Sequence, residues 1–144
     1  MANQKLEQII VWLEGKLNTV ADFDKVEYTD DNQSPPVVKD YGAHMYRTPG
    51  EDYEEERVHI GNHLKEFWSI NTDIIINRHF QSPRKSVSDA KGISYWLDTI
   101  KTLLNEGSNS GVFDSSRWIY DDYIKDTDMY TLKGRFTCEL VNTY

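Results

Sequence analysis

The sequence is short of cysteine and of long hydrophobic runs, and each shortage excludes a class of protein. Its single cysteine, Cys138, rules out a disulfide framework, and its place on the apolar side of a strand pattern predicts a small buried side chain. No run approaches the roughly 20 apolar residues that a membrane span needs, and the N-terminus has no apolar core of the secretory-signal type. We therefore expect a protein made and used in a cytosol, without a membrane anchor.

Positive charge is scarce between residues 21 and 56. This segment holds eleven acidic residues against three basic ones, so it carries the whole formal net charge of -8, while the charges of the rest of the chain balance. A nucleic-acid clamp needs Lys and Arg to contact phosphates, which excludes this segment from that role. An acidic surface repels DNA or binds a basic protein instead.

Three common functional motifs are also absent. The sequence has no glycine-rich phosphate loop, no nucleophile elbow and no EF-hand loop. His59 and His63 have the spacing of two zinc ligands on one helical turn, but Gly61 between them and the extended pattern around them favour surface histidines. We therefore expect no catalytic residue, no metal and no cofactor.

A length of 144 residues is that of one domain, and two amphipathic helices are predicted within it. The first covers residues 3–20. The second covers residues 86–107, where Ser86 and Asp89 form a capping box, apolar residues follow at three-and-four spacing, and Gly107 ends the helix in the left-handed conformation. Each helix has one apolar face that needs a partner surface.

Alternation of apolar and polar residues predicts strands on both sides of the second helix. The clearest strands cover residues 64–77 and 129–140, and shorter ones are indicated at 23–28, 37–47 and 112–124. This order predicts an α+β fold, in which two amphipathic helices pack on a mixed or antiparallel sheet of four to five strands.

The region between residues 29 and 57 combines turn-forming and acidic residues. Two proline-containing breaks, at 34–36 and 48–50, interrupt it, and residues 51–56 hold five acids. Long segments of this composition are usually functional or disordered. We interpret residues 29–57 as an extended acidic arm that orders on a partner.

Several aromatic residues fall where a compact domain does not need them. Tyrosine supplies a large contact area at an interface, although tyrosines that only stabilise strands are the alternative. Trp12 lies off the main apolar stripe of the first helix, so it is either the flank of the core or an anchor for another subunit. The candidate interface residues are Trp12, Tyr41, Tyr46, Glu51, Asp52, Tyr53, Glu54, Glu55, Glu56 and Tyr144.

The order of these elements, over nearly the whole chain, resembles the tail terminator (tail completion) proteins of long-tailed bacteriophages. The resemblance covers the first helix, the acidic region 30–56, the strand ending in Asp73-Ile74-Ile75-Ile76-Asn77-Arg78, the second helix and the closing strand 130–140. The family has no short diagnostic motif and no catalytic residues.

The resemblance implies a structural virion protein of the phage neck. Such proteins form a hexameric ring that caps the finished tail tube, stops addition of the major tail tube protein, and joins the tail to the head completion (stopper) protein. They assemble in the host cytoplasm, and the genomic DNA passes through the lumen of the ring without specific binding. Carboxylates in such a lumen keep DNA mobile by repulsion.

Two alternatives stay open. One is another neck protein, a head completion or adaptor protein, which differs by binding on the portal side. The other is a small α+β metal-dependent enzyme whose site is built from His59, His63 and the neighbouring acids.

Overall fold

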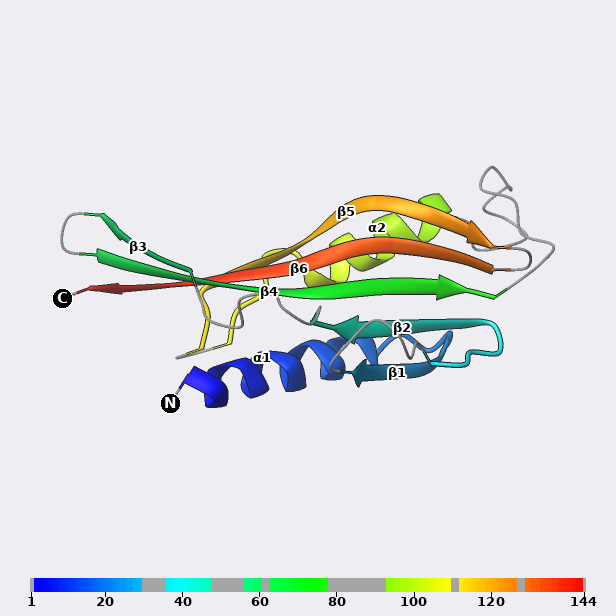
Figure 1. The fold of residues 1–144 in the computed structure, drawn as a ribbon, viewed down its shortest axis with the longest axis horizontal. Helices are drawn as coiled ribbons and strands as arrows, with labels where there is room; N and C mark the ends of the chain where they lie inside the picture. Colours follow the sequence, from blue (N-terminus) through cyan, green and yellow to red (C-terminus); the bar gives the residue numbers. More distant parts are fainter. Residues whose placement is uncertain are drawn as a thin grey trace.

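The computed structural model describes residues 2–29, 36–47, 56–60, 63–77, 93–109, 112–126 and 129–143. These residues form two helices and a single sheet of six strands (Figure 1). In chain order the elements are α1 (Ala2–Leu17), β1 (Phe23–Thr29), β2 (Tyr41–Tyr46), β3 (Glu56–Ile60), β4 (His63–Ile76), α2 (Ile93–Leu104), β5 (Ser115–Asp126) and β6 (Met129–Thr143). The predicted α+β fold is therefore confirmed.

The sheet is mixed, with the strand order β1-β2-β4-β6-β5. β1 and β2 run parallel, whereas all other neighbouring strands run antiparallel. β3 pairs with the first part of β4 and β2 pairs with the second part, so two strands follow each other along one side of β4. The sheet consequently has six strands, one more than the upper end of the predicted range.

Side-chain alternation gives the sheet an apolar face and a polar face. Both helices pack on the apolar face, which we call the helix face. From the helices, the buried core takes Ile9, Leu13, Leu17, Trp96, Ile100 and Leu104; from the sheet, it takes mainly Met45, Trp68, Ile70, Ile74, Ile76, Trp118, Leu132 and Phe136. Cys138 also lies there and is 3% exposed, as its position in the strand pattern predicts. We call the opposite side of the sheet the polar face.

One end of the sheet extends past both helices as a three-stranded ribbon (Figure 1). The ribbon consists of β3, the beginning of β4 and the end of β6. Its register runs from Glu56↔Phe67 to Ile60↔His63 on one side of β4 and continues to His63↔Thr143 on the other. The fold therefore has a body covered by helices on one side and a narrow extension without helices.

The predicted acidic arm, residues 29–57, contains regular structure. Residues 41–46 form β2, an inner strand, and β3 begins at Glu56. The approach to β2 is held in place, because the side chain of Asn77 donates to the carbonyl of Val38 at 2.7 Å and its backbone N–H donates to Asp40 at 2.8 Å. The arm prediction therefore narrows to residues 30–35 and 48–55, which lie outside the described residues.

The second predicted helix differs at its end. α2 is described from Ile93, so Ser86 and Asp89 lie outside the described residues, and it ends at Leu104. The left-handed residue is Glu106, with φ 60°, and not Gly107. Gly107 is needed for close packing, because a Cβ there would lie 2.6 Å from Ser116 Oγ and from the Trp12 ring.

The turn after α2 covers the outer edge of β5. Glu106 N–H donates to the carbonyl of Ser116 at 2.8 Å, and the N–H of Trp118 donates to Asn105 Oδ1 at 2.9 Å. Farther along, the N–H of Tyr123 donates to Oδ1 of its neighbour Asp122 at 2.8 Å. These bonds satisfy outward-facing backbone groups, which limits pairing of this edge with another strand.

We expect Glu106→Gly to raise the free energy of unfolding by about 0.5–1 kcal/mol, because glycine adopts positive φ without a Cβ clash. Glu106→Ala is the matched control, since it removes the same exposed side chain and keeps the strained backbone. Chemical denaturation measures both variants. Equal stability of the two would show that the conformation of Glu106 costs nothing.

Candidate functional site

Three strands are irregular at the same level of the sheet. The β4–β6 ladder is interrupted between Asn71↔Arg135 and Ile74↔Leu132, and the register of β5 against β6 shifts between Tyr120 and Asp122. Bulges and ladder breaks of this kind free backbone groups and redirect side chains, and they are enriched next to functional sites. The candidate site is built around this level.

On the helix face, Trp118 fills the interruption. Its indole packs against Gly134, at a distance that leaves no room for a Cβ, and its Nε1–H donates to the carbonyl of Thr72 at 3.0 Å. Because Trp118 is 2% exposed, this hydrogen bond satisfies a buried donor and a carbonyl at the ladder break. Trp118 thereby ties β5 to β4 across β6.

On the polar face, the same level carries a row of ionisable and polar side chains from β1 to β6. Lys133 Nζ donates to Asp73 Oδ2 and to Tyr46 Oη, both at 2.7 Å. Next to them, His44 Nε2 and Thr29 Oγ1 are 2.7 Å apart, and the rings of His44 and Tyr46 stack with centroids 4.9 Å apart. We call these five residues the polar row.

The polar row is buried in its middle. His44, Tyr46 and Asp73 are at most 4% exposed, while the side chain of Lys133 is 30% exposed. Burying a carboxylate is costly unless its oxygens are satisfied. Within the described part of the chain, Oδ1 of Asp73 has no hydrogen-bond partner.

The pKa shifts follow from this geometry. Burial raises the pKa of Asp73 and outweighs the opposing hydrogen bond from Lys133. Burial lowers the pKa of Lys133, but its hydrogen bonds to Asp73 and Tyr46 outweigh that effect and leave its pKa raised. Burial also raises the pKa of Tyr46. The ammonium thus gains from the pair, whereas the carboxylate, with one oxygen unsatisfied, loses more by burial than it gains.

The charge states in the polar row favour a stabilising role for these residues over a catalytic one. A lysine with a raised pKa stays protonated at neutral pH and is a poor nucleophile or base. Burial raises the pKa of the Cys138 thiol to about 12, so that it is no nucleophile either. Among the described residues, no group of three or more His, Cys, Asp or Glu could hold a metal ion, and in the β3–β4 hairpin His59 pairs with Leu64 and not with His63.

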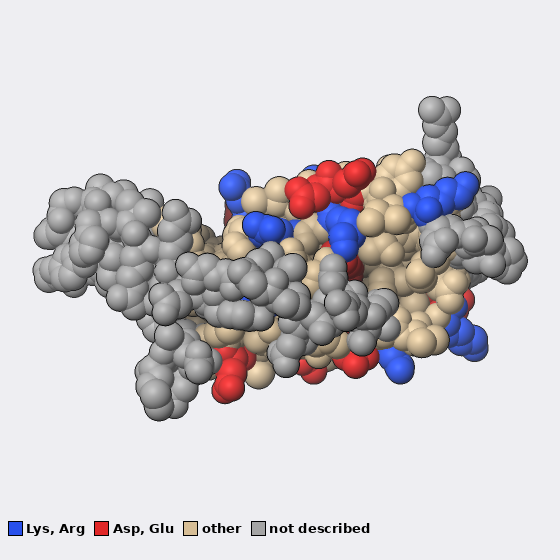
Figure 2. All heavy atoms as spheres, viewed as in Figure 1, with Lys and Arg blue, Asp and Glu red and all other residues tan. Residues whose placement is uncertain are grey.

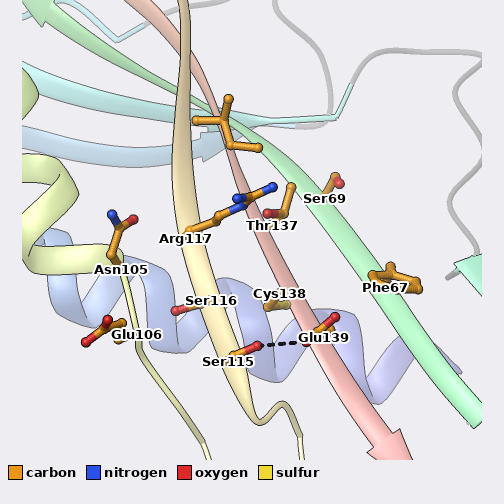
Figure 3. A pocket seen from close by; sticks show the side chains of 11 residues that line it. Phe67, Ser69, Asn105, Glu106, Ser115, Ser116, Arg117, Thr137, Cys138 and Glu139 are labelled. Atoms are coloured by element: carbon orange, nitrogen blue, oxygen red, sulfur yellow. Dashed lines mark hydrogen bonds between the residues drawn. The ribbon is translucent and has the colours of Figure 1, made fainter.

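A hollow of about 680 Å³ lies beside the polar row, toward the ribbon (Figure 3). Arg117 of β5 reaches over β6 toward Thr137 and Ser69, and Ser115 donates to Glu139 at 3.2 Å. The lining is mixed in character, without a convergent set of polar groups of the kind that orients a small ligand. Around it, acidic side chains on the β5 side of the sheet stand directly beside basic ones (Figure 2).

Four of the ten predicted interface residues lie in the described part of the chain. Tyr41 and Tyr46 are 6% and 4% exposed, which leaves little of either ring for a partner. Trp12 forms the flank of the core, with ring centroids 5.0 Å from Phe113 and 5.7 Å from Phe136. Glu56 begins β3. The residues outside the described part of the chain are Glu51, Asp52, Tyr53, Glu54, Glu55 and Tyr144.

Sequence reasoning missed the polar row. Asp73 and Lys133 are on the polar side of their strand patterns, where a solvated residue is the ordinary interpretation. The register of β4 against β6 brings Asp73 and Lys133 together, between the pairs Ile70↔Phe136 and Ile76↔Tyr130. This register is not visible in a single sequence.

Comparison with known proteins leaves the family open. No protein-family model matches the chain, and no curated protein matches it. In the described part of the chain, no helix is long and apolar enough to cross a membrane.

Proposed function

We propose that this chain is a tail terminator of a long-tailed bacteriophage, a structural subunit of the virion neck and not an enzyme. In this role it forms a ring on the end of the tail tube, stops the addition of tube subunits and joins the tail to the head completion protein. The observation that carries the proposal is the one-sided sheet with its ribbon, which offers a different surface in each of three directions.

The three surfaces suit a ring subunit. The helix face and the polar face lie on opposite sides of the sheet, so contact between unlike faces of neighbouring copies is heterologous and closes into a ring when the rotation fits. The ribbon extends along the strand direction, past the helices (Figure 1), and would reach along the ring axis to the tube or the head protein. Edge strand β1 would then face the lumen.

The charge of β1 supports this orientation. The exposed acids Asp24 and Glu27 of β1 outnumber its one exposed base, Lys25, and the chain as a whole has a formal net charge of -8. A lumen with such an edge repels the DNA backbone and lets the genome pass without binding. A head completion or adaptor protein would need the same ring geometry, so the two roles are separated by the partner that binds.

The experiment is a measurement of molecular mass by light scattering, with and without assembled tail tubes. We expect a species near six times 16.8 kDa, either alone or on tube ends, and tubes of fixed length in its presence. A ring that binds the portal-side proteins and ignores tubes would establish the adaptor role instead. A monomer that is indifferent to tubes would refute the proposal.

A further inference from the structure

We propose that neighbouring copies in the ring join through an arginine patch on the polar face and an acidic groove on the helix side. The arginine patch is Arg117, Ile119 and Arg135. The acidic groove lies between the turn that follows α1 and the helix α2. This inference rests on the proposed ring, and it names the surfaces that would hold the ring together.

The arginine patch is an exposed apolar side chain framed by two cations. Ile119 is 39% exposed and lies opposite Arg135 in the β5–β6 register, and Arg117 precedes it by two residues on the same face. Both arginines are exposed, and neither has an ion-pair partner among the described residues. Arg117 also extends over the hollow in Figure 3, so its head group is presented at the surface.

Two acids of β5 and β6 on the polar face make hydrogen bonds within the chain. Asp122 accepts a hydrogen bond from the N–H of Tyr123, and Glu139 accepts one from the hydroxyl of Ser115. Both carboxylates keep their negative charge when they accept these bonds, and neither forms an ion pair with Arg117 or Arg135 among the described residues. What the patch offers a partner is therefore two arginine head groups without an ion pair among the described residues, standing beside these acids (Figure 2).

The acidic groove has the complementary character. It encloses about 740 Å³ and is lined by residues 19–22 and by α2. Its apolar lining includes Val20, Tyr95 and Leu103, which are only partly buried against the core, and Asp22 and Asp98 add two carboxylates. Asp98 is exposed and has no ion-pair partner among the described residues.

A second copy of this chain is the occupant that these surfaces favour. An apolar residue between two arginines fits an apolar groove that carries the Asp98 carboxylate, and complementary charge fixes partner and register. Because patch and groove lie on opposite sides of the sheet, each copy offers both, and the contact repeats from copy to copy. Two copies cannot make both the patch-to-groove and the groove-to-patch contact with each other at once, because the two surfaces point in opposite directions. This favours a ring or a filament over a two-fold dimer.

A charge swap tests the contact. Arg135→Glu alone and Asp98→Arg alone should each weaken self-association by about tenfold or more, because each places like charges across the contact. The double variant Arg135→Glu/Asp98→Arg should recover most of the wild-type association. Sedimentation velocity over a range of protein and salt concentrations gives the association constants, and thermal unfolding verifies the fold of each variant.

Lys25→Glu is the matched control, since Lys25 is exposed on the polar face of β1, away from the patch. It should leave association unchanged. A wild-type chain that does not self-associate, single variants that associate like the wild type, or a double variant as weak as the singles would each overturn the inference. Rings that form and respond to the swap but do not bind tubes would support this contact while refuting the terminator role.

Discussion

Gly134→Ala should destabilise the protein by about 3 kcal/mol and lower Tm by roughly 10 °C, a large loss for the addition of one methyl group. The added Cβ would overlap the indole of Trp118. The indole has no free direction in which to move, since it is buried and its Nε1–H is bonded to the carbonyl of Thr72. Thermal and chemical denaturation measure the loss.

Two comparisons isolate the cause. Gly15→Ala introduces the same change in α1, where a Cβ would meet nothing within 4 Å, and it should add about 0.5–1 kcal/mol of stability. In a Trp118→Ala background, Gly134→Ala should cost little, so the double-mutant cycle should show a coupling of about 2–3 kcal/mol. Additive effects would mean that Gly134 is required for a reason other than the indole.

Lys133→Met should destabilise the protein by about 2–3 kcal/mol at pH 7, because it leaves the Asp73 carboxylate buried without its ammonium. We expect less than the loss for a fully buried pair, since Lys133 is partly exposed. Lys25→Met, at an exposed position, is the control and should change stability by less than about 0.5 kcal/mol. Equal effects of the two variants would contradict the importance of the pair.

The pH dependence of Lys133→Met has a defined sign. The folded-state pKa of Asp73 is already above 3.8, so the charged carboxylate costs stability above that pKa, and the cost disappears as the pH falls through it. Removing Lys133 removes a contact that lowers this pKa, so the pKa rises further in the variant. The difference in stability between variant and wild type should therefore shrink as the pH falls from 7, and Lys133→Met/Asp73→Asn should remove that dependence.

The wild-type protein should show the complementary effect in alkali. The pKa of Lys133 is raised above 10.5, so its contribution is complete below that value and is lost as the pH rises through the folded-state pKa. Tyr46 acts in the same direction, since its raised pKa penalises the ionised phenol in the folded state. In Lys133→Met, the lysine part of this alkaline loss should be absent.

The elements of this fold could be predicted from sequence wherever periodicity was long. Apolar residues recur at every second position in most of the predicted strands 64–77 and 129–140, although Asp73 and Ile75 are buried on the polar face too. α1 and the described part of α2 follow their apolar stripes. β2 was harder to interpret, because Gly42, His44 and Tyr46 are buried beside Tyr41, Ala43 and Met45, and a strand buried on both sides loses its alternation.

What the sequence could not supply was the meeting of distant residues. Lys133 and Tyr46 are 87 positions apart, and Trp118 and Thr72 are 46 apart, yet each pair shares a hydrogen bond. General preference predicts Gly107 as the left-handed residue after α2, whereas the structure has Glu106 in that conformation. Close packing against Trp12 and Ser116 is what requires the glycine. Local preference yields when tertiary contacts decide the backbone.

The position of β6 bears on how the chain reaches its native state during translation. β6 lies between β4 and β5, yet it is synthesised after every other strand of the sheet. Until β6 has been synthesised, one backbone edge of β4 and one of β5 lack their partner strand. A nascent chain with unpaired strand edges and incompletely buried apolar residues is prone to aggregate or to recruit a chaperone. The body of the fold therefore cannot close before β6 is in place, and it forms more slowly than a fold closed by local contacts.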